Sequence, residues 1–202
     1  MLPNRQNRLA DARRALAMQR PMTSLIEREI LTTSECLAFE RENWVDAFVD
    51  YGHTVTFDRA RTRANRGIAT ADGTLFWLVR RDGKAHGYHA LADDPLAAVE
   101  EAERAWSRRR KVRARWSEIE ATAHDLMVGR RRFGVAVEDA FASPLCTLGI
   151  RAFMRRYRIP AHREVSGRFA ALLMRIEPQV GFVIHEAERR AMLSEEGVLR
   201  EV

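Results

Sequence analysis

The chain has 202 residues, and its composition excludes several classes of protein before any motif is considered. A hydrophobic content of 46% is normal for a globular protein and excludes a disordered chain. Lysine and arginine number 34 against 28 acidic residues, which gives a net charge of +6, and all but Lys84 and Lys111 of these basic residues are arginines. A basic balance favours a nucleic-acid partner, although a high-GC genome also enriches arginine without any function.

Two cysteines, Cys36 and Cys146, are too few for a disulfide framework or a zinc site with four thiolates. We expect two buried free thiols in a cytoplasmic protein, with one long-range disulfide as the alternative. No apolar run approaches the roughly 20 residues of a membrane span, so no membrane partner is expected. The arginine-rich residues 1–20 are expected to be a basic helix or arm rather than a transit peptide.

The first part of the chain is predicted to be helical. Leucines and alanines repeat at helical spacing before Pro21, and two capping-box pairs open further helices, Ser24 with Glu27 and Thr32 with Glu35. The last of these helices is expected to carry a row of apolar residues, Leu37, Trp44, Val45 and Phe48, and to end at Gly52. Residues 1–52 are therefore predicted to be an N-terminal helical segment.

A small antiparallel sheet is predicted next. Residues 54–57 alternate as a strand does, whereas 61–66 are expected to be a loop. Asp72-Gly73 lies between two β-rich runs, and Asp82-Gly83 follows the second of them. Because Asp-Gly is a strong signal for a hairpin turn, we expect a meander of three to four strands.

Helices are predicted over the remainder of the chain. Asp94-Pro95 supplies an N-cap and a proline at the first position of a long helix, which is expected to kink or restart near Trp116 and to end at Gly129. Shorter helices are predicted at 138–142, 145–157, 166–176 and 179–193. The predicted fold is α+β, with segments 1–52, 53–128 and 129–202 that can also form one compact domain.

Basic residues are concentrated in the predicted sheet and in the later half of the long helix. Residues 59–91 hold seven basic residues and two acids, and 108–133 hold nine and three. Guanidinium groups bind phosphates and guanine edges, an antiparallel sheet can enter a major groove, and an exposed tryptophan can stack on unpaired bases. The residues expected to bind nucleic acid are Arg59, Arg61, Arg63, Arg66, Trp77, Arg80, Arg81, Arg108, Arg109, Arg110, Lys111, Arg113, Arg115, Arg130, Arg131 and Arg132.

A structural explanation stands beside each of these expectations. Trp77 can belong to the core, with the sheet arginines as a solvated rim. The basic run 108–115 covers more than one face of a helix, so its arginines can instead pair with the acidic segment 35–50 or cover apolar surface with their stems. Exposed runs of charge are more often solvated than functional.

The stretch from Gly83 to Trp106 is similar to plant AP2-type domains and to integrase arm-binding domains. The matching residues are Gly87-Tyr88-His89, then Asp94-Pro95, followed by the small residues Ala98, Ala102 and Ala105. This resemblance implies a sheet that contacts DNA and a helix that lies close behind it. The order of elements also resembles a double-stranded-RNA-binding domain.

Two further constellations have a structural interpretation that we favour. Residues 138–157 are predicted to form two helices that break at Ser143-Pro144, and the second carries Arg151, Arg155, Arg156 and Arg158. This pattern fits a helix-turn-helix, but the DNA-reading motif often has glycine in its turn, so an ordinary helical pair is preferred. Cys146 with His162 lacks an orienting acid or oxyanion hole, so a structural cysteine is preferred and no catalytic, metal or cofactor site is predicted.

The function expected from the sequence is that of a non-enzymatic nucleic-acid-binding protein, regulatory or accessory, with DNA favoured over RNA. The alternative is a protein-protein interaction module, an adaptor or an inhibitor, whose alternating blocks of charge bind a partner protein or a second copy of the chain.

Overall fold

The computed structural model describes residues 36–59 and 61–200, and the side chains of 195–200 are not considered. The helices predicted before Leu31 lie outside the described residues. The chain divides into two compact units, Met1–Ala102 and Glu103–Val202, and the boundary between them falls inside helix α3. Each unit is described by itself below.

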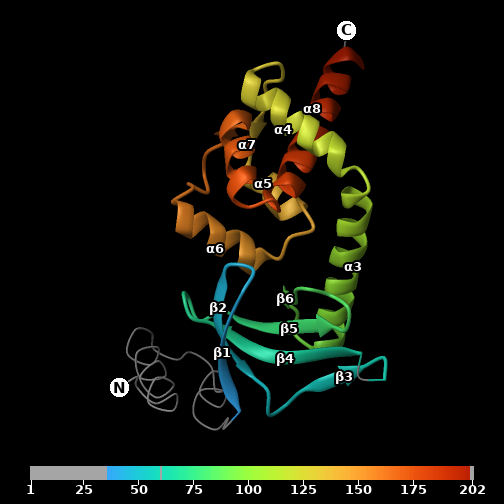
Figure 1. The fold of residues 1–202 in the computed structure, drawn as a ribbon, viewed down its shortest axis with the longest axis vertical. Coiled ribbons are helices and arrows are strands. Elements are labelled where there is room, and N and C mark those ends of the chain that lie inside the picture. Colours follow the sequence, from blue (N-terminus) through green and yellow to red (C-terminus); the bar gives the residue numbers. More distant parts are fainter. Residues whose placement is uncertain (1–35, 60, 201–202) are drawn as a thin grey trace. The chain divides into compact units, whose positions relative to one another are not determined.

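The first unit contains a six-stranded antiparallel sheet (Figure 1). Its strands are β1 (Leu37–Glu42), β2 (Val45–Asp50), β3 (Val55–Phe57), β4 (Thr62–Ala69), β5 (Leu75–Arg81) and β6 (Tyr88–Ala90). The strand order is β1-β2-β4-β5-β6, and β3 pairs with β4 beside β2. The α+β class is therefore confirmed, with a larger sheet than the three to four strands expected.

The helix predicted to end at Gly52 is wrong, because β1 and β2 form a hairpin in its place. Asn43 and Trp44 form the two-residue turn with φ values of 49° and 71°, the positive-φ pair that such a tight turn requires. The error has a physical cause. Phe48 and Val49 point to opposite faces of β2, yet both are buried, so the alternation that marks a strand is hidden in the sequence.

The predicted loop at 61–66 is also wrong, since these residues begin β4. The register places Arg63 opposite Arg80 and Thr62 opposite Arg81, an arrangement that sequence propensity does not favour. Both Asp-Gly turns are confirmed. Gly73 has a φ of 69° between β4 and β5, and Gly83 has a φ of 76° after β5, conformations that glycine adopts without a steric cost.

The start of α3 (Pro95–Arg113) belongs to the first unit. Asp94 caps it as predicted, because its carboxylate accepts hydrogen bonds from the backbone N–H groups of Leu96 and Ala97 at 2.8 and 2.9 Å. The small residues Ala98 and Ala102 are fully buried, and the hydroxyl of Tyr88 on β6 donates to Glu101.

The second unit consists of helices and one short β-ribbon. After α3 come α4 (Trp116–Val128), β7 (Gly134–Val135), α5 (Val137–Ala142), α6 (Thr147–Tyr157), β8 (Val165–Ser166), α7 (Gly167–Ile176) and α8 (Val180–Arg200). The predicted break near Trp116 and the predicted helix end at Gly129 are both confirmed, and Gly129 has the left-handed conformation of a helix cap. So are the helical starts near 138 and 166 and the separation of the last two helices at Pro178.

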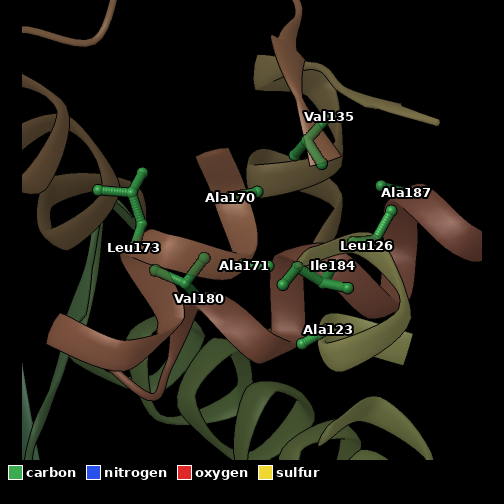
Figure 2. Packing of buried hydrophobic residues seen from close by; sticks show 9 residues of the cluster. All are labelled: Ala123, Leu126, Val135, Ala170, Ala171, Leu173, Val180, Ile184 and Ala187. Carbon is green, nitrogen blue, oxygen red and sulfur yellow. The ribbon is translucent and has the colours of Figure 1, made fainter. Parts of the chain in front are cut away.

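The core of the second unit forms where α4, α7 and α8 meet (Figure 2). Small and branched residues fill it: Ala123, Leu126, Val135, Ala170, Ala171, Leu173, Val180, Ile184 and Ala187. Gly167 at the start of α7 allows a close approach, because a Cβ there would lie 2.6 Å from both Leu126 and the carbonyl oxygen of Phe133. A second cluster joins α3 to α4 and α8 through Val112, Ile119 and Phe182.

Candidate nucleic-acid interface

Three of the six arginines at 59–81, Arg63, Arg80 and Arg81, are engaged by acidic side chains of the same unit. Arg63 lies 2.8 Å from Asp82, and Arg81 lies 2.8 Å from Asp58 while also donating to the hydroxyl of Thr62. Such pairs leave a guanidinium with less free charge to offer a phosphate.

Arg80 is held most firmly, at the centre of a polar network on one face of the sheet. Its guanidinium donates to Glu40 at 2.8 Å, to Glu42 at 2.9 Å and to the hydroxyl oxygen of Tyr51 at 2.9 Å. Burial acts to lower the pKa of Arg80, but the hydrogen bonds to Glu42 and Glu40 outweigh it and raise that pKa. Arg80 therefore stabilises the sheet by joining β5 to β1.

Tyr51 completes this network by donating its hydroxyl to Glu40 at 2.7 Å. Burial and the hydrogen bond to Glu40 raise the pKa of Tyr51 to about 12. Burial alone would raise the pKa of Glu40, but hydrogen bonds from Tyr51 and Arg80 hold it below its usual range. The three groups therefore keep a fixed protonation pattern at neutral pH: a carboxylate, a neutral phenol and a guanidinium.

Tyr51 reaches the network because the chain leaves the sheet between β2 and β3. Both strands pair with β4, β2 along its second half and β3 along its first. The buried side chain of Asn65 on β4 bridges the interruption, since its amide donates to the carbonyl oxygen of Asp50 and to the hydroxyl of Thr54. An interrupted strand of this kind redirects side chains at a sheet surface.

Trp77 is not available for stacking on a base, which corrects the expectation drawn from the sequence. The residue is only 8% exposed, and the guanidinium carbon of Arg66 lies 5.1 Å from its ring centroid. Trp77 therefore belongs to the core, and Arg66 forms a cation–π contact with it. Arg59 and Arg61 are exposed, and neither side chain has an ion pair within 36–59 and 61–200.

The basic run at 108–115 separates into anchored and unanchored residues. Arg108 donates to the carbonyl oxygen of Ala142 and lies 3.1 Å from Glu186, and Arg109 donates to the carbonyl oxygen of Pro144 at 2.9 Å. These contacts fasten α3 to α8 and to the end of α5. Arg115 pairs with Glu118 one turn along α4. The remaining cations are exposed and have no ionic partner among the residues described: Arg110, Lys111 and Arg113.

The three arginines that follow α4, at 130–132, also include both paired and unpaired residues. Arg130 lies 3.3 Å from Asp125, and Arg131 pairs with Glu188 of α8. Arg132 is exposed and unpaired in the part of the chain that the structure covers. Of the nine cations singled out from the sequence at 108–115 and 130–132, Arg108, Arg109 and Arg131 connect separate elements of the second unit, and Arg115 and Arg130 form local pairs. The other four have no acidic partner among the described residues.

The cations of α6 and of its connection to β8 are exposed, although they were not among the residues expected to bind nucleic acid. Arg151 and Arg155 lie four residues apart and form a short exposed arginine row on α6, and the exposed Arg158 follows as the left-handed residue that ends the helix. Arg156 and Arg163 are also exposed, and the side chains of Arg151, Arg156, Arg158 and Arg163 have no acidic partner in the described ranges. The signal was present in the composition, because residues 151–168 hold six arginines and one acid.

α6 can present this row because its neighbours are fixed from behind. Leu148 and Ile150 of α6 are buried on different sides of the helix, so α6 is packed into the unit by more than one side. α5 is anchored to α8 by Arg190, which donates to the buried carboxylate of Asp139 at 2.8 and 3.0 Å. Asp139 in turn accepts from the backbone N–H of Ala136, the residue before α5. The row therefore lies on a rigid element, which suits a binding surface.

The residues considered for catalysis or metal binding are not brought together in the described part of the chain. Cys146 is buried at the start of α6, whereas His162 is exposed in the connection to β8. Cys36, expected to be buried, is exposed. Within the described residues no group of three or more histidine, cysteine or acidic side chains is placed to hold a metal ion. No helix there is both long and apolar enough to cross a membrane.

Comparison with known proteins adds no family to these observations. No family model matches the chain, and neither a curated protein nor a solved structure matches it.

Proposed function

We propose that the protein is a non-enzymatic nucleic-acid-binding protein, and that its second unit supplies the binding surface. One observation carries the proposal: exposed cations without an acidic partner in the described chain are concentrated in this unit. They lie on α6 and the connection that follows it, at the end of α3 and after α4: Arg151, Arg156, Arg158, Arg163, Arg110, Lys111, Arg113 and Arg132.

Free cations suit this role better than paired ones for a simple electrostatic reason. Binding to a polyanion releases the counterions condensed on its phosphates, and each cation that neutralises a phosphate contributes to the affinity. A guanidinium already bound to a carboxylate must first lose that partner, so its net contribution is smaller. The sheet is therefore a weaker candidate than its basic composition suggests.

The proposed target is double-stranded DNA contacted through its phosphates. Bidentate guanidinium groups bind phosphate oxygens well, and most of the exposed cations without an acidic partner in the described part of the second unit are arginines. The contacts on which the proposal depends all go to phosphate, so they carry little base specificity. Regulatory or accessory proteins that bind DNA with little sequence preference use contacts of this kind.

The proposal is tested by the salt dependence of binding to a random-sequence duplex. The first variant combines Arg151→Gln, Arg156→Gln and Arg163→Gln, which removes three unpaired cations. Each lost phosphate contact lowers the slope of log K against log salt by about 1, so the slope is expected to fall by about 2 to 3. Single-stranded DNA and duplex RNA of matched length show whether duplex DNA is the preferred ligand.

A matched control removes the same formal charge from paired arginines. It combines Arg41→Gln, Arg63→Gln and Arg130→Gln, whose partners are Asp46, Asp82 and Asp125. The control is expected to keep nearly the full slope. Absence of binding at low salt overturns the proposed function, and an equal loss of slope in both variants overturns the assignment to α6.

A further inference from the structure

One face of α7 carries a row of uncovered apolar side chains. Phe169, Leu172 and Ile176 are 40%, 47% and 54% exposed, and their spacing of three and four residues places them on the same side of the helix. The opposite side of α7 is buried in the unit's core through Ala170 and Leu173 (Figure 2). Single exposed apolar residues are ordinary, whereas a continuous row along a helix marks an interaction surface.

Two arginines border this row along one edge. Arg168 and Arg175 are seven residues apart, which is about two helical turns, and both lie on the Leu172 side of Phe169, about 100–120° around the helix. Both are exposed, and neither has an ion pair or side-chain hydrogen bond in the part of the chain described. α7 itself contains no acidic residue. The face therefore combines an apolar row with an unneutralised positive edge.

We propose that this face of α7 binds an amphipathic helix of a partner protein, one whose apolar side is bordered by a row of acidic residues. Helix-on-helix packing buries the apolar row through residues spaced three and four apart on both partners. The acidic row then meets Arg168 and Arg175, which fixes the register and direction of the bound helix. This surface is separate from the arginine row of α6 and does not depend on nucleic-acid binding.

The distribution of charge on α7 favours an acidic partner helix over two other occupants, a second copy of the chain and a membrane surface. A second copy of the chain packed antiparallel about a twofold axis would place Arg168 of one α7 beside Arg175 of the other, so like charges would face each other. A helix that lies in an anionic membrane surface usually has cations along both sides of its apolar face. In α7 they lie along one side only, because the other side is packed into the core.

The test uses the full-length protein and two synthetic peptides of about 18 residues that differ in one edge of the helix. Both have the same apolar row, and one has glutamate where the other has glutamine along the edge. Fluorescence anisotropy of the labelled peptides at physiological salt measures the affinity. The glutamate peptide is expected to bind about tenfold more tightly.

Three variants locate the site. Leu172→Asn is expected to abolish binding of both peptides. Arg168→Gln combined with Arg175→Gln is expected to remove the advantage of the glutamate peptide and to leave the glutamine peptide unaffected. The control combines Arg113→Gln with Arg132→Gln, which removes the same charge elsewhere in the unit and is expected to change neither affinity.

Several results would overturn the proposal. These are no binding of either peptide at millimolar concentration, equal affinity for the two peptides, and binding that Leu172→Asn does not weaken. Self-association in sedimentation equilibrium that Leu172→Asn abolishes would assign the face to a second copy instead. Stronger binding to anionic phosphatidylserine vesicles than to the glutamate peptide, with the same dependence on Leu172, would assign it to a lipid surface.

Discussion

Replacing Arg190 with glutamine removes the main partner of a carboxylate that is almost fully buried. The side chain of Asp139 is only 4% exposed and accepts two hydrogen bonds from Arg190, at 2.8 and 3.0 Å. Arg190 also donates to the carbonyl oxygen of Gly134 and to Glu164. One guanidinium therefore connects α8 to β7, to α5 and to the connection before β8.

The size of the stability loss depends on which residue of the Arg190–Asp139 pair is buried. Breaking a buried ion pair by removing one partner costs about 3–5 kcal/mol, whereas an exposed pair contributes under about 1 kcal/mol. Arg190 is 43% exposed, but without it the one hydrogen-bond donor left to the Asp139 carboxylate among the described residues is the backbone N–H of Ala136. Because burial of Asp139 dominates and Ala136 compensates in part, we expect Arg190→Gln to lower the free energy of unfolding by about 2–3 kcal/mol.

Urea unfolding followed by far-UV circular dichroism at 222 nm measures this effect. The signal at 222 nm reports helix, and α4 to α8 all lie in the second unit, which contains Arg190. For a chain of this length the loss corresponds to a fall in Tm of about 5–10 °C. The control, Arg156→Gln, replaces an unpaired arginine and is expected to change the free energy by less than about 0.5 kcal/mol. Adding Asp139→Asn to Arg190→Gln removes the stranded charge and is expected to recover part of the loss. A loss under about 1 kcal/mol in Arg190→Gln would refute the reasoning, because the pair would then behave as an exposed one.

Three further predictions concern packing, titration and the interrupted strand. Gly167→Ala is expected to destabilise the second unit by about 1–3 kcal/mol, because the new methyl group would meet Leu126, and an unchanged urea midpoint would contradict this. Tyr51 has a folded pKa of about 12, above the unfolded value of about 10, so its contribution to stability is complete below pH 10 and is lost as the pH rises toward 12. Ultraviolet titration of the tyrosinate band should show one late transition that Tyr51→Phe removes, and a late transition that persists would assign it to another tyrosine. Asn65→Ala is expected to cost about 1–3 kcal/mol because the carbonyl oxygen of Asp50 and the hydroxyl of Thr54 lose a donor, and hydrogen exchange at residues 50–54 should accelerate.

The parts of the fold that the sequence predicted correctly have strong local signals. Asp94-Pro95, Gly129 and the two Asp-Gly turns each restrict the backbone by their own chemistry, so no knowledge of distant residues is needed. The hairpin at 37–50 has no local signal of this kind. β2 is buried on both faces, so its apolar residues gave no alternation, and the spacing of Trp44 and Phe48 resembled a helix. β2 is held by the hairpin with β1, whose turn has no Asn-Gly or Asp-Gly signal, and by pairing with β4, which is not local.

The candidate site was harder to predict for a related reason. Segment charges can be counted from the sequence, but the availability of a charge depends on its neighbours in space. Arg108 lies 78 residues from Glu186, and Arg80 lies 40 residues from Glu40, so neither pair has a local signal. Burial of Trp77 depends likewise on the strands and side chains around it. Counting charges along the chain therefore overestimates the cations available on the sheet and underestimates those on α6.

Partnered and unpartnered arginines in this chain differ in their physical roles. Some arginines with acidic partners connect elements that lie far apart in sequence, as Arg80 does with Glu40 and Arg108 with Glu186. Those without partners add nothing of this kind, and their mutual repulsion lowers the stability of the folded unit. The exposed arginines of α6 and its connection to β8 therefore carry a small cost that a polyanionic ligand would remove on binding. If the proposed function is correct, duplex DNA should raise the urea midpoint of the second unit, and the stabilisation should vanish both at high salt and in the variant that lacks Arg151, Arg156 and Arg163.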